Sequence, residues 1–480
     1  SREGEMLFRH LYGFLGCKQP CLRLWISSLT DEAITEGMAN LLPCDRFDNL
    51  FLAADSRNRA DWLLGVNSSY AICKAVGFGN NSLGRVQTPV LAEICRRYRD
   101  RENHMPADCW PVFISLCKND RILKMRHVDD LVVRREALAL YEDCKAAKSV
   151  RITAVGKRTE EIGAPALYNL AELQKDANRY HSLTAIQVQE IAQGLYEKKL
   201  ISYPRTSSRL LPKDVYDTLP PVMEKMLSRK EFRQYADTVD LAAPRDSIEA
   251  QDTMEHHAII ITGTQPGKLD REEMLVYTLI VGRMLETFMP PCKVEYTTVD
   301  AVCAARKFRI RTYRILEKGW LGIFEREHIV AKGRMPYQVM PEFFQEEILP
   351  VAGCSLIHKK SLPVSPYTDE ELVDYMDKAG LGTVSTRTNI LRTLLERKYI
   401  RYSGKYVVPT PKGLFLYETV RGMKVADASL TSGWETELAR IERGELSQEE
   451  FLDGVLETVN EVTGEISRNH PVEKRPQGTI

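Results

Sequence analysis

Two segments with the residue pattern of β-strands lie far apart in this chain, with a helical segment between them. Residues 110–116 and 121–127 are rich in apolar and β-branched side chains and are expected to pair as strands. Residues 293–315 alternate again between apolar and polar side chains, whereas helical patterns fill the interval after Pro165. A strand-rich unit interrupted by a helical one predicts a discontinuous, interleaved fold rather than a row of separate domains.

The overall composition is typical of a soluble globular protein. The chain has 480 residues, of which 44% are hydrophobic and 28% charged, and this length suggests roughly three or four domains. Lys plus Arg and Asp plus Glu number 66 each, which counts mildly against a nucleic-acid binder, although basic residues cluster within 96–101 and 145–158. No apolar run is long enough to cross a bilayer, and no signal peptide opens the chain.

The cysteines and the first residues give two further expectations. The eleven cysteines form no Cys-x-x-Cys pair and no evident zinc site, so reduced and mostly buried thiols are predicted. The chain begins at Ser1 inside a pattern of helical spacing, which predicts that an N-terminal piece is missing.

Local signals place the remaining elements. Residues 22–30 read as a strand, followed by a helix from Thr30-Asp31; helices are also expected over 53–76 and from about Thr88 to Arg101, after a turn at Asn80–Gly84. Thr184 with Gln187 and Thr368 with Glu371 are capping boxes. A helical break at Gly380–Gly382, a helix over Ser385–Lys398 and a hairpin over 399–408 give the order of a winged helix.

Tyr203 is the first candidate for a reactive side chain. Pro204 restricts Tyr203 to extended backbone, so the phenol is expected outside regular helix, where it can act as a nucleophile. Arg205 can contact a phosphodiester with its planar fork of donors. The alternative is an ordinary strand-to-loop junction with an exposed tyrosine, and these residues alone do not decide between the two.

Several further motifs occur in one order along the chain. They are Ser1–Glu5 (SREGE), Ala54–Trp62 (ADSRNRADW), Ser82–Pro89 (SLGRVQTP), Leu195–Glu197 (LYE), His256–Ile260 (HHAII) and Gly382–Arg387 (GTVSTR). Together with the Tyr203 segment, they resemble the type IA DNA topoisomerases of the topoisomerase III branch, from the first residue to about residue 450.

The resemblance implies a chemistry. Tyr203 would attack a DNA phosphodiester and become linked to the 5′ phosphate, leaving a free 3′ hydroxyl, and resealing would need no ATP. Arg205 would stabilise charge on the phosphoryl oxygens, with a surface ion pair as its alternative role. His256 matches the family's active-site histidine, although a structural histidine is the alternative, and His257 is expected to support packing.

The family's DNA-contacting positions also have counterparts here. In the turn Gly84–Gln87, the glycine permits close approach of a strand, and Arg85 and Gln87 can bond phosphate or base; a plain helix N-terminus is the alternative. Arg57 and Asp61 stand at i and i+4, a spacing that also gives an ordinary ion pair. The DNA-contacting set that the resemblance implies is Arg57, Asp61, Ser82, Leu83, Gly84, Arg85, Val86, Gln87 and Arg387.

The metal site departs from the family pattern. Glu3 matches the final glutamate of the Asp-x-Asp-x-Glu array in the family's toprim domain, but Ser1 falls at the second aspartate and the earlier part is absent. Mg²⁺ is the cofactor that the resemblance implies, and Glu3 with Glu5 alone would bind it poorly. The family's proline after Ala-Ile-Ile is Ile261 here, and the cysteine-rich zinc ribbons of many relatives are absent.

The resemblance implies an α+β multidomain toroid. Its parts would be a toprim remnant (1–25), a helical base with a winged helix (26–105 and 355–465), a strand-rich arch (106–162 and 290–345), a helical domain carrying the active-site tyrosine (163–289) and a flexible tail (466–480). The expected partner is DNA, with single-stranded segments preferred, for a monomeric, cytoplasmic and nucleoid-associated enzyme without a membrane partner.

Two other functions remain open at this point. The chain could be a catalytically inactive single-stranded DNA-binding fragment, which has the same fold and differs only in whether the missing acids exist. A relaxase-like strand transferase is disfavoured, because His256 and His257 have no third histidine nearby.

Overall fold

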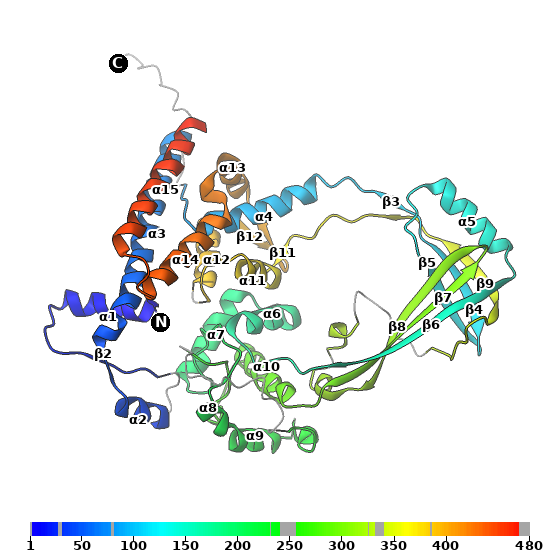
Figure 1. Cartoon of the computed structure of the whole chain (residues 1–480), viewed down its shortest axis with the longest axis horizontal. Helices are drawn as coiled ribbons and strands as arrows, with labels where there is room; N and C mark the ends of the chain where they lie inside the picture. The colour runs from blue at the N-terminus through cyan, green and yellow to red at the C-terminus, as the bar shows by residue number, and fades with distance from the viewer. Residues whose placement is uncertain are drawn as a thin grey trace, which may run out of the picture.

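The computed structural model of the chain describes residues 2–26, 31–77, 81–230, 232–240, 256–324, 326–331, 340–384 and 386–469; the side chains of 31–33 and 328 are left out. The expectations for residues 27–30, Asn80, Ser385 and the tail from residue 470 therefore lie outside the described residues. The elements follow a ring, with helices on one side and a strand barrel on the other (Figure 1).

The helical side of the ring is built on two long helices that pack together. Helix α3 (Asp48–Val76) contacts α15 (Gln448–Asn469), which buries Val455, Val459, Val462 and Ile466, and this spacing of four, three and four residues forms one apolar stripe. The other helices of this base are α1 (Arg2–Phe14), α4 (Gln87–Glu102), α11 (Asp369–Lys378), α12 (Arg387–Glu396), α13 (Pro411–Val420) and α14 (Ala428–Glu442).

A small sheet completes the base. Strands β12 (Ile400–Ser403) and β13 (Tyr406–Pro409) form the hairpin expected over 399–408, and β11 (Tyr367–Thr368) adds to β13. The Thr368 capping box is confirmed at the start of α11. Helix α12 begins at Arg387 and follows α11 directly, so the described elements have the order helix, helix, hairpin.

The expected strand over 22–30 is wrong in extent. Of the described residues 22–26, only Leu22–Arg23 (β1) is strand; it pairs with Leu42–Pro43 (β2), and α2 (Asp31–Ala39) lies between the two strands in sequence. The thiol prediction also needs correction, because Cys21 and Cys44 form a disulfide beside this pairing; the nine other cysteines form no disulfide.

The two distant strand-rich segments pair in one closed barrel, as expected. Its order is β4-β5-β8-β7-β6-β9, and the long strands β6 and β7 pair from Arg151↔Val302 to Ile162↔Cys292. The bounds are β4 (Val112–Lys118), β5 (Arg121–His127), β6 (Ser149–Ile162), β7 (Cys292–Cys303), β8 (Arg306–Glu317) and β9 (Ile348–Leu356). Since β9 pairs with both β4 and β6, the arch extends beyond the expected limit at residue 345.

Side-chain direction separates the two faces of the barrel wall. Val299, Ala301, Phe308 and Ile310 belong to the barrel core with Ile152, so neighbours two residues along each strand share this inner face. Helix α5 (Arg134–Ala146) packs against the barrel, and β3 (Asp108–Cys109) pairs with β10 (Lys359–Lys360) where the chain passes between base and barrel (Figure 1).

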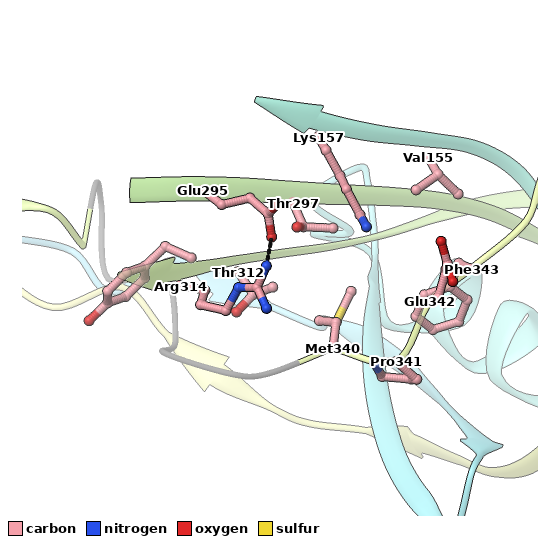
Figure 2. Close-up of a pocket in the computed structure, with 11 residues that line it drawn as sticks. Val155, Lys157, Glu295, Thr297, Thr312, Arg314, Met340, Pro341, Glu342 and Phe343 are labelled. Atoms are coloured by element: carbon pink, nitrogen blue, oxygen red, sulfur yellow. Dashed lines mark hydrogen bonds and ion pairs between the residues drawn. The ribbon is translucent and has the colours of Figure 1, made fainter. Parts of the chain in front are cut away.

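Polar side chains continue the inner face of β6, β7 and β8 into a cavity of about 230 Å³. Figure 2 shows Lys157, Glu295, Thr297, Thr312 and Arg314 around it, with segment 340–343 on the opposite side. Arg314 pairs with Glu295 at 3.0 Å.

A third unit of helices carries Tyr203. It comprises α6 (Leu170–His181), α7 (Ala185–Glu197), α8 (Lys213–Asp217), α9 (Leu219–Leu227) and α10 (Arg271–Thr287), which share an apolar core separate from that of the barrel. The Thr184 capping box is confirmed at the start of α7. At the other end of the chain, the expected tail begins too early, because Ile466 is fully buried within α15.

Candidate active site around Tyr203

Tyr203 lies in a non-helical segment that follows the end of α7. Lys199 has a left-handed backbone (φ 58°), and the Leu200 amide donates to the Leu195 carbonyl at 3.0 Å, which closes the helix. The next residues pair with 258–261: Ile201 bridges to Ile261, and the Ser202 amide donates to the Ile260 carbonyl at 2.8 Å. The prediction that Tyr203 lies outside regular helix is therefore confirmed.

The same pairing brings His256 to Tyr203. Thr206 donates through its hydroxyl to the His256 carbonyl at 2.9 Å, and the Ser202 hydroxyl donates to the Ala258 carbonyl at 3.0 Å. The rings of Tyr203 and His256 lie 4.4 Å apart between centroids, and the Tyr196 ring contacts Tyr203 edge-on at 5.4 Å. Two motifs that are about fifty residues apart in sequence thus form one site.

Two polar atoms at this site are buried without a hydrogen-bond partner within the described residues. They are Nε of Arg205 and Nδ1 of His256. Buried polar groups normally have a hydrogen-bond partner. Two nitrogens without one, beside a phenol, are suited to binding an anionic group that is not part of the chain. His257, by contrast, is buried with Nδ1 2.7 Å from the Ala258 carbonyl, in agreement with a packing role.

Electrostatics fix the protonation states at neutral pH. Burial raises the pKa of the Tyr203 phenol, Arg205 opposes this shift, and Glu3 adds to it. Burial lowers the pKa of His256 to about 4, with a smaller contribution from His257. Tyr203 is therefore a neutral phenol and His256 a neutral imidazole, so that ionisation of the phenol requires a proton acceptor.

Helix α1 places Glu3 within electrostatic range of Tyr203. The helix is fixed to the base by ion pairs: Arg2 contacts Glu442 and, at 3.1 Å, Glu435, while Arg9 contacts Asp48 at 2.7 Å. Glu3 is half-buried. The carboxylate predicted from sequence as catalytic thus lies on the base, and its charge acts on the tyrosine of another unit.

The donor set at Glu3 does not fit Mg²⁺. Glu5 is fully buried and occupied by two arginines, Arg9 at 2.8 Å and Arg23 at 2.7 Å. Among the residues that the structure describes, no group of three or more His, Cys, Asp or Glu side chains could hold a metal ion. Since Mg²⁺ prefers several oxygen ligands, the described part of the chain offers one free carboxylate where more are needed.

The turn at 82–87 is tightly bonded to the base. The amide of Ser82 donates to the Tyr399 hydroxyl (2.8 Å), that of Leu83 to the Ser69 hydroxyl (3.0 Å) and that of Gly84 to the Thr88 hydroxyl (2.9 Å). Val86 and Gln87 are half-buried at the start of α4. These amides are thus already occupied, which fits the helix N-terminus alternative and leaves DNA contact to the partly exposed side chains.

The Arg57–Asp61 ion pair, the alternative that the i, i+4 spacing offered, does not form within the described residues. Asp61 instead pairs with Arg85 at 2.7 Å, and Arg85 also contacts Glu435 at 3.1 Å and the Trp434 ring. The Arg85 side chain is 4% exposed, so the two carboxylates and the Trp434 ring enclose its guanidinium in this structure. Arg57 is half-buried and forms no ion pair within the described ranges.

Glu435 is a residue that sequence reasoning missed. It contacts both Arg2, the neighbour of Glu3, and Arg85. More than three hundred residues separate it from either arginine, and no local motif marks it.

Arg387 begins α12, is 8% exposed and pairs with Asp377 at 2.7 Å. No hydrogen bond or ion pair recorded within the described residues joins Arg57, Asp61, the 82–87 turn or Arg387 to Tyr203.

Comparison with known proteins agrees with this arrangement. The family model described as DNA topoisomerase matches residues 45–453, and the chain therefore belongs to that family. "DNA topoisomerase 3" of Bacillus licheniformis is 29% identical over 502 residues, covering 98% of this chain and 68% of the relative. "DNA topoisomerase 3" of Bacillus subtilis (strain 168) is 28% identical, with the same coverage. Within the family, the chain is a type IA topoisomerase of the topoisomerase III-like branch.

The fold also matches a solved structure. Full-length topoisomerase I from Thermotoga maritima superposes with a TM-score of 0.78 at 20% identity, covering 96% of this chain and 76% of that one. The α+β toroid expected from the sequence is confirmed at this level. No described helix is long and apolar enough to cross a membrane.

Proposed function

We propose that the chain carries the strand-cleaving and strand-passing apparatus of a type IA topoisomerase. The Tyr203 oxygen bonds to the phosphorus of a DNA strand, the bond from phosphorus to the 3′ oxygen breaks, and the 3′ oxygen leaves as a hydroxyl after taking up a proton. The reverse attack reseals the strand without ATP, because the phosphotyrosine bond conserves the energy of the phosphodiester.

The observation that supports this chemistry is the pair of unsatisfied buried nitrogens beside Tyr203. Arg205 supplies positive charge to the phosphoryl oxygens, and neutral His256 contacts the same phosphate through a ring nitrogen. We assign to Glu3 the proton that Tyr203 loses, because its carboxylate lies within electrostatic range of the phenol. We derive no step through Mg²⁺, since the described ligands do not fit it.

We further propose that single strands are preferred to duplex, that the protein acts as a monomer, and that it is cytoplasmic and nucleoid-associated. The domain division expected from the sequence, with its toprim remnant and winged helix, is also a proposal, with the arch extended to include β9 and the tail beginning after α15. Strand passage would proceed by movement of the Tyr203 unit away from the base. Ion pairs between α6 and α11 support this, because partly exposed pairs contribute little to holding the two units together.

The test of Tyr203 is the Tyr203→Phe variant. It removes one oxygen, so covalent trapping on single-stranded DNA should disappear while noncovalent binding stays near that of the unchanged protein. The Tyr196→Phe variant is the matched control, because the Tyr196 ring contacts Tyr203 but its phenol is assigned no bond to DNA. A covalent complex that survives in Tyr203→Phe would show that another group is the nucleophile.

The second candidate function is a single-stranded DNA-binding fragment that does not cleave. The lack of a fitting donor set for Mg²⁺ among the described residues favours it. A supercoil-relaxation assay with Mg²⁺ separates the two, since relaxation by the 480-residue chain would exclude the binding-only function. Trapping without relaxation would leave the nucleophile assigned and the catalytic cycle incomplete.

A further inference from the structure

The outer face of the barrel carries a row of cations on two neighbouring strands. We name Lys124 and Arg126 of β5 with Lys307, Arg309 and Arg311 of β8 the outer basic face. The register defines it: Arg309 lies opposite Asp300, Arg311 opposite Thr298, and Lys307 opposite Val302 on β7. These positions alternate with Phe308 and Ile310, which face the barrel core, so the cations point away from it.

The two strands place like charges opposite one another. Arg126 is the registered partner of Arg309, and like charges directly across a sheet are unfavourable without compensation. Each arginine has its own carboxylate: Arg126 pairs with Asp130, and Arg309 pairs with Asp300 through two hydrogen bonds. The arginine pair is thus neutralised locally.

The other three cations have no such compensation. Lys124, Lys307 and Arg311 are exposed, and within the described ranges none of them has an ion pair or side-chain hydrogen bond. Two of them act on Asp300: the pKa of Asp300 is lowered by its hydrogen bonds to Arg309 and further by the charges of Arg311 and Lys307. The outer basic face therefore has an excess of about three positive charges, in a chain whose overall charge is zero.

The neighbouring strand β6 adds small side chains to this surface. On the same outer face, Gly156 of β6 lies opposite Thr298, and Ala154 lies opposite Asp300; both β6 residues are exposed. Small side chains let a partner's backbone approach the cations closely. The inner face of these strands differs, because the cavity in Figure 2 balances Lys157 and Arg314 with Glu295 and Glu342.

We propose that the outer basic face binds the sugar–phosphate backbone of DNA, as a second contact region distinct from the Tyr203 site. A nucleic acid presents phosphates at regular intervals, and cations two residues apart on one strand recur about every 6.6 Å. The excess of cations, beside the small residues Ala154 and Gly156 and the exposed Ile122, favours a phosphate backbone over an apolar protein partner. The inference rests on the proposed action on DNA, but it needs no cleavage.

The test is the salt dependence of DNA binding. Lys124, Lys307 and Arg311 are changed together to Ala in a Tyr203→Phe background, which separates the readout from cleavage. The matched control changes Lys213, Lys230 and Lys268 to Ala. These are three exposed lysines of the Tyr203 unit, so the control removes the same number of positive charges. Affinity for a single-stranded oligonucleotide, and for a duplex of equal length, is measured across a range of salt concentrations.

Each phosphate contact to a single strand contributes about −0.7 to the slope of log affinity against log salt. The triple variant of the outer basic face, called the arch variant, should therefore have a slope that is less negative by up to about 2. Between about 50 and about 200 mM salt, its affinity would then fall up to about 16-fold less than that of the parent. The control variant should keep the parent's slope.

Either of two results would overturn the proposal. One is an unchanged slope on both DNAs, and the other is an equal loss in the arch and control variants, which would reflect net charge alone. A smaller salt slope with the single-stranded oligonucleotide would show that the face binds single-stranded DNA. A smaller slope with the duplex alone would show that it binds double-stranded DNA. Covalent trapping is scored separately in the protein that keeps Tyr203, so failure of one proposal leaves the other measurable.

Discussion

Contacts between the Tyr203 unit and the base should control how often the two separate. Lys175 of α6 pairs with Asp374 of α11 at 2.8 Å, and Arg179 pairs with Glu370. Between the same units, the Ala185 amide at the start of α7 donates to the Asp369 carboxylate at 2.8 Å. Exposure of that amide to solvent requires the units to part, so Ala185 reports directly on opening.

The perturbation is the double variant Asp374→Lys and Arg179→Glu, which leaves the net charge unchanged. Each change removes one attractive pair worth about 0.5 kcal/mol and adds a repulsion of about the same size. The docked state should lose about 2 kcal/mol in all, which corresponds to about a 30-fold larger open fraction. High salt should reduce the difference, because these pairs are partly exposed and therefore screened.

Hydrogen–deuterium exchange of the peptide containing the Ala185 amide is the assay, and its protection should fall by about the same 30-fold factor. The control is Glu461→Lys with Arg443→Glu, which breaks two exposed ion pairs within the base and is again neutral in net charge. Unchanged protection, or an equal loss in the control, would refute the view that these ion pairs hold the units together.

Three further outcomes are expected. Arg205→Ala should slow cleavage by about 10²-fold or more if the guanidinium meets charge in the transition state, and a loss confined to binding would reduce it to a positioning group. Because the pKa of His256 is about 4 in the folded protein and near 6.5 unfolded, stability falls as pH drops from 6.5 towards 4; His256→Asn should lose this part of the dependence in urea unfolding. Gly413→Ala would place a methyl group 2.1 Å from the Tyr399 carbonyl oxygen, so it should lower the free energy of unfolding by about 1–3 kcal/mol in denaturant titrations, and an unchanged midpoint would contradict the packing.

Local chemistry was readable from the sequence. Thr184 and Thr368 cap their helices as predicted, because a capping box lies within four residues. The β4–β5 and β7–β8 pairings also follow from strand pattern and short turns. Tyr203 was found through Pro204 and Arg205, which act on the adjacent backbone and side chain, and its exclusion from helix needed no distant contact.

The partners of charged side chains were decided by tertiary structure. The i, i+4 spacing suggested Arg57 with Asp61, yet Asp61 meets Arg85, because packing of the 82–87 turn against α3 and α14 buries that guanidinium between two carboxylates. A buried charge needs compensation wherever the fold provides it, whereas an exposed helical pair contributes little. Sequence spacing therefore cannot rank the two.

Two other features also could not be predicted from local sequence, because they join segments that are distant along the chain. The Cys21–Cys44 disulfide and the place of β9 in the barrel depend on segments that meet only after the chain has folded. The sequence alone determined the order of elements, the reactive tyrosine and the family's motifs, since each is encoded within a few neighbouring residues. Only the tertiary structure decided that Glu3, Tyr203 and His256 share one site, because three separate segments must pack before their charges interact.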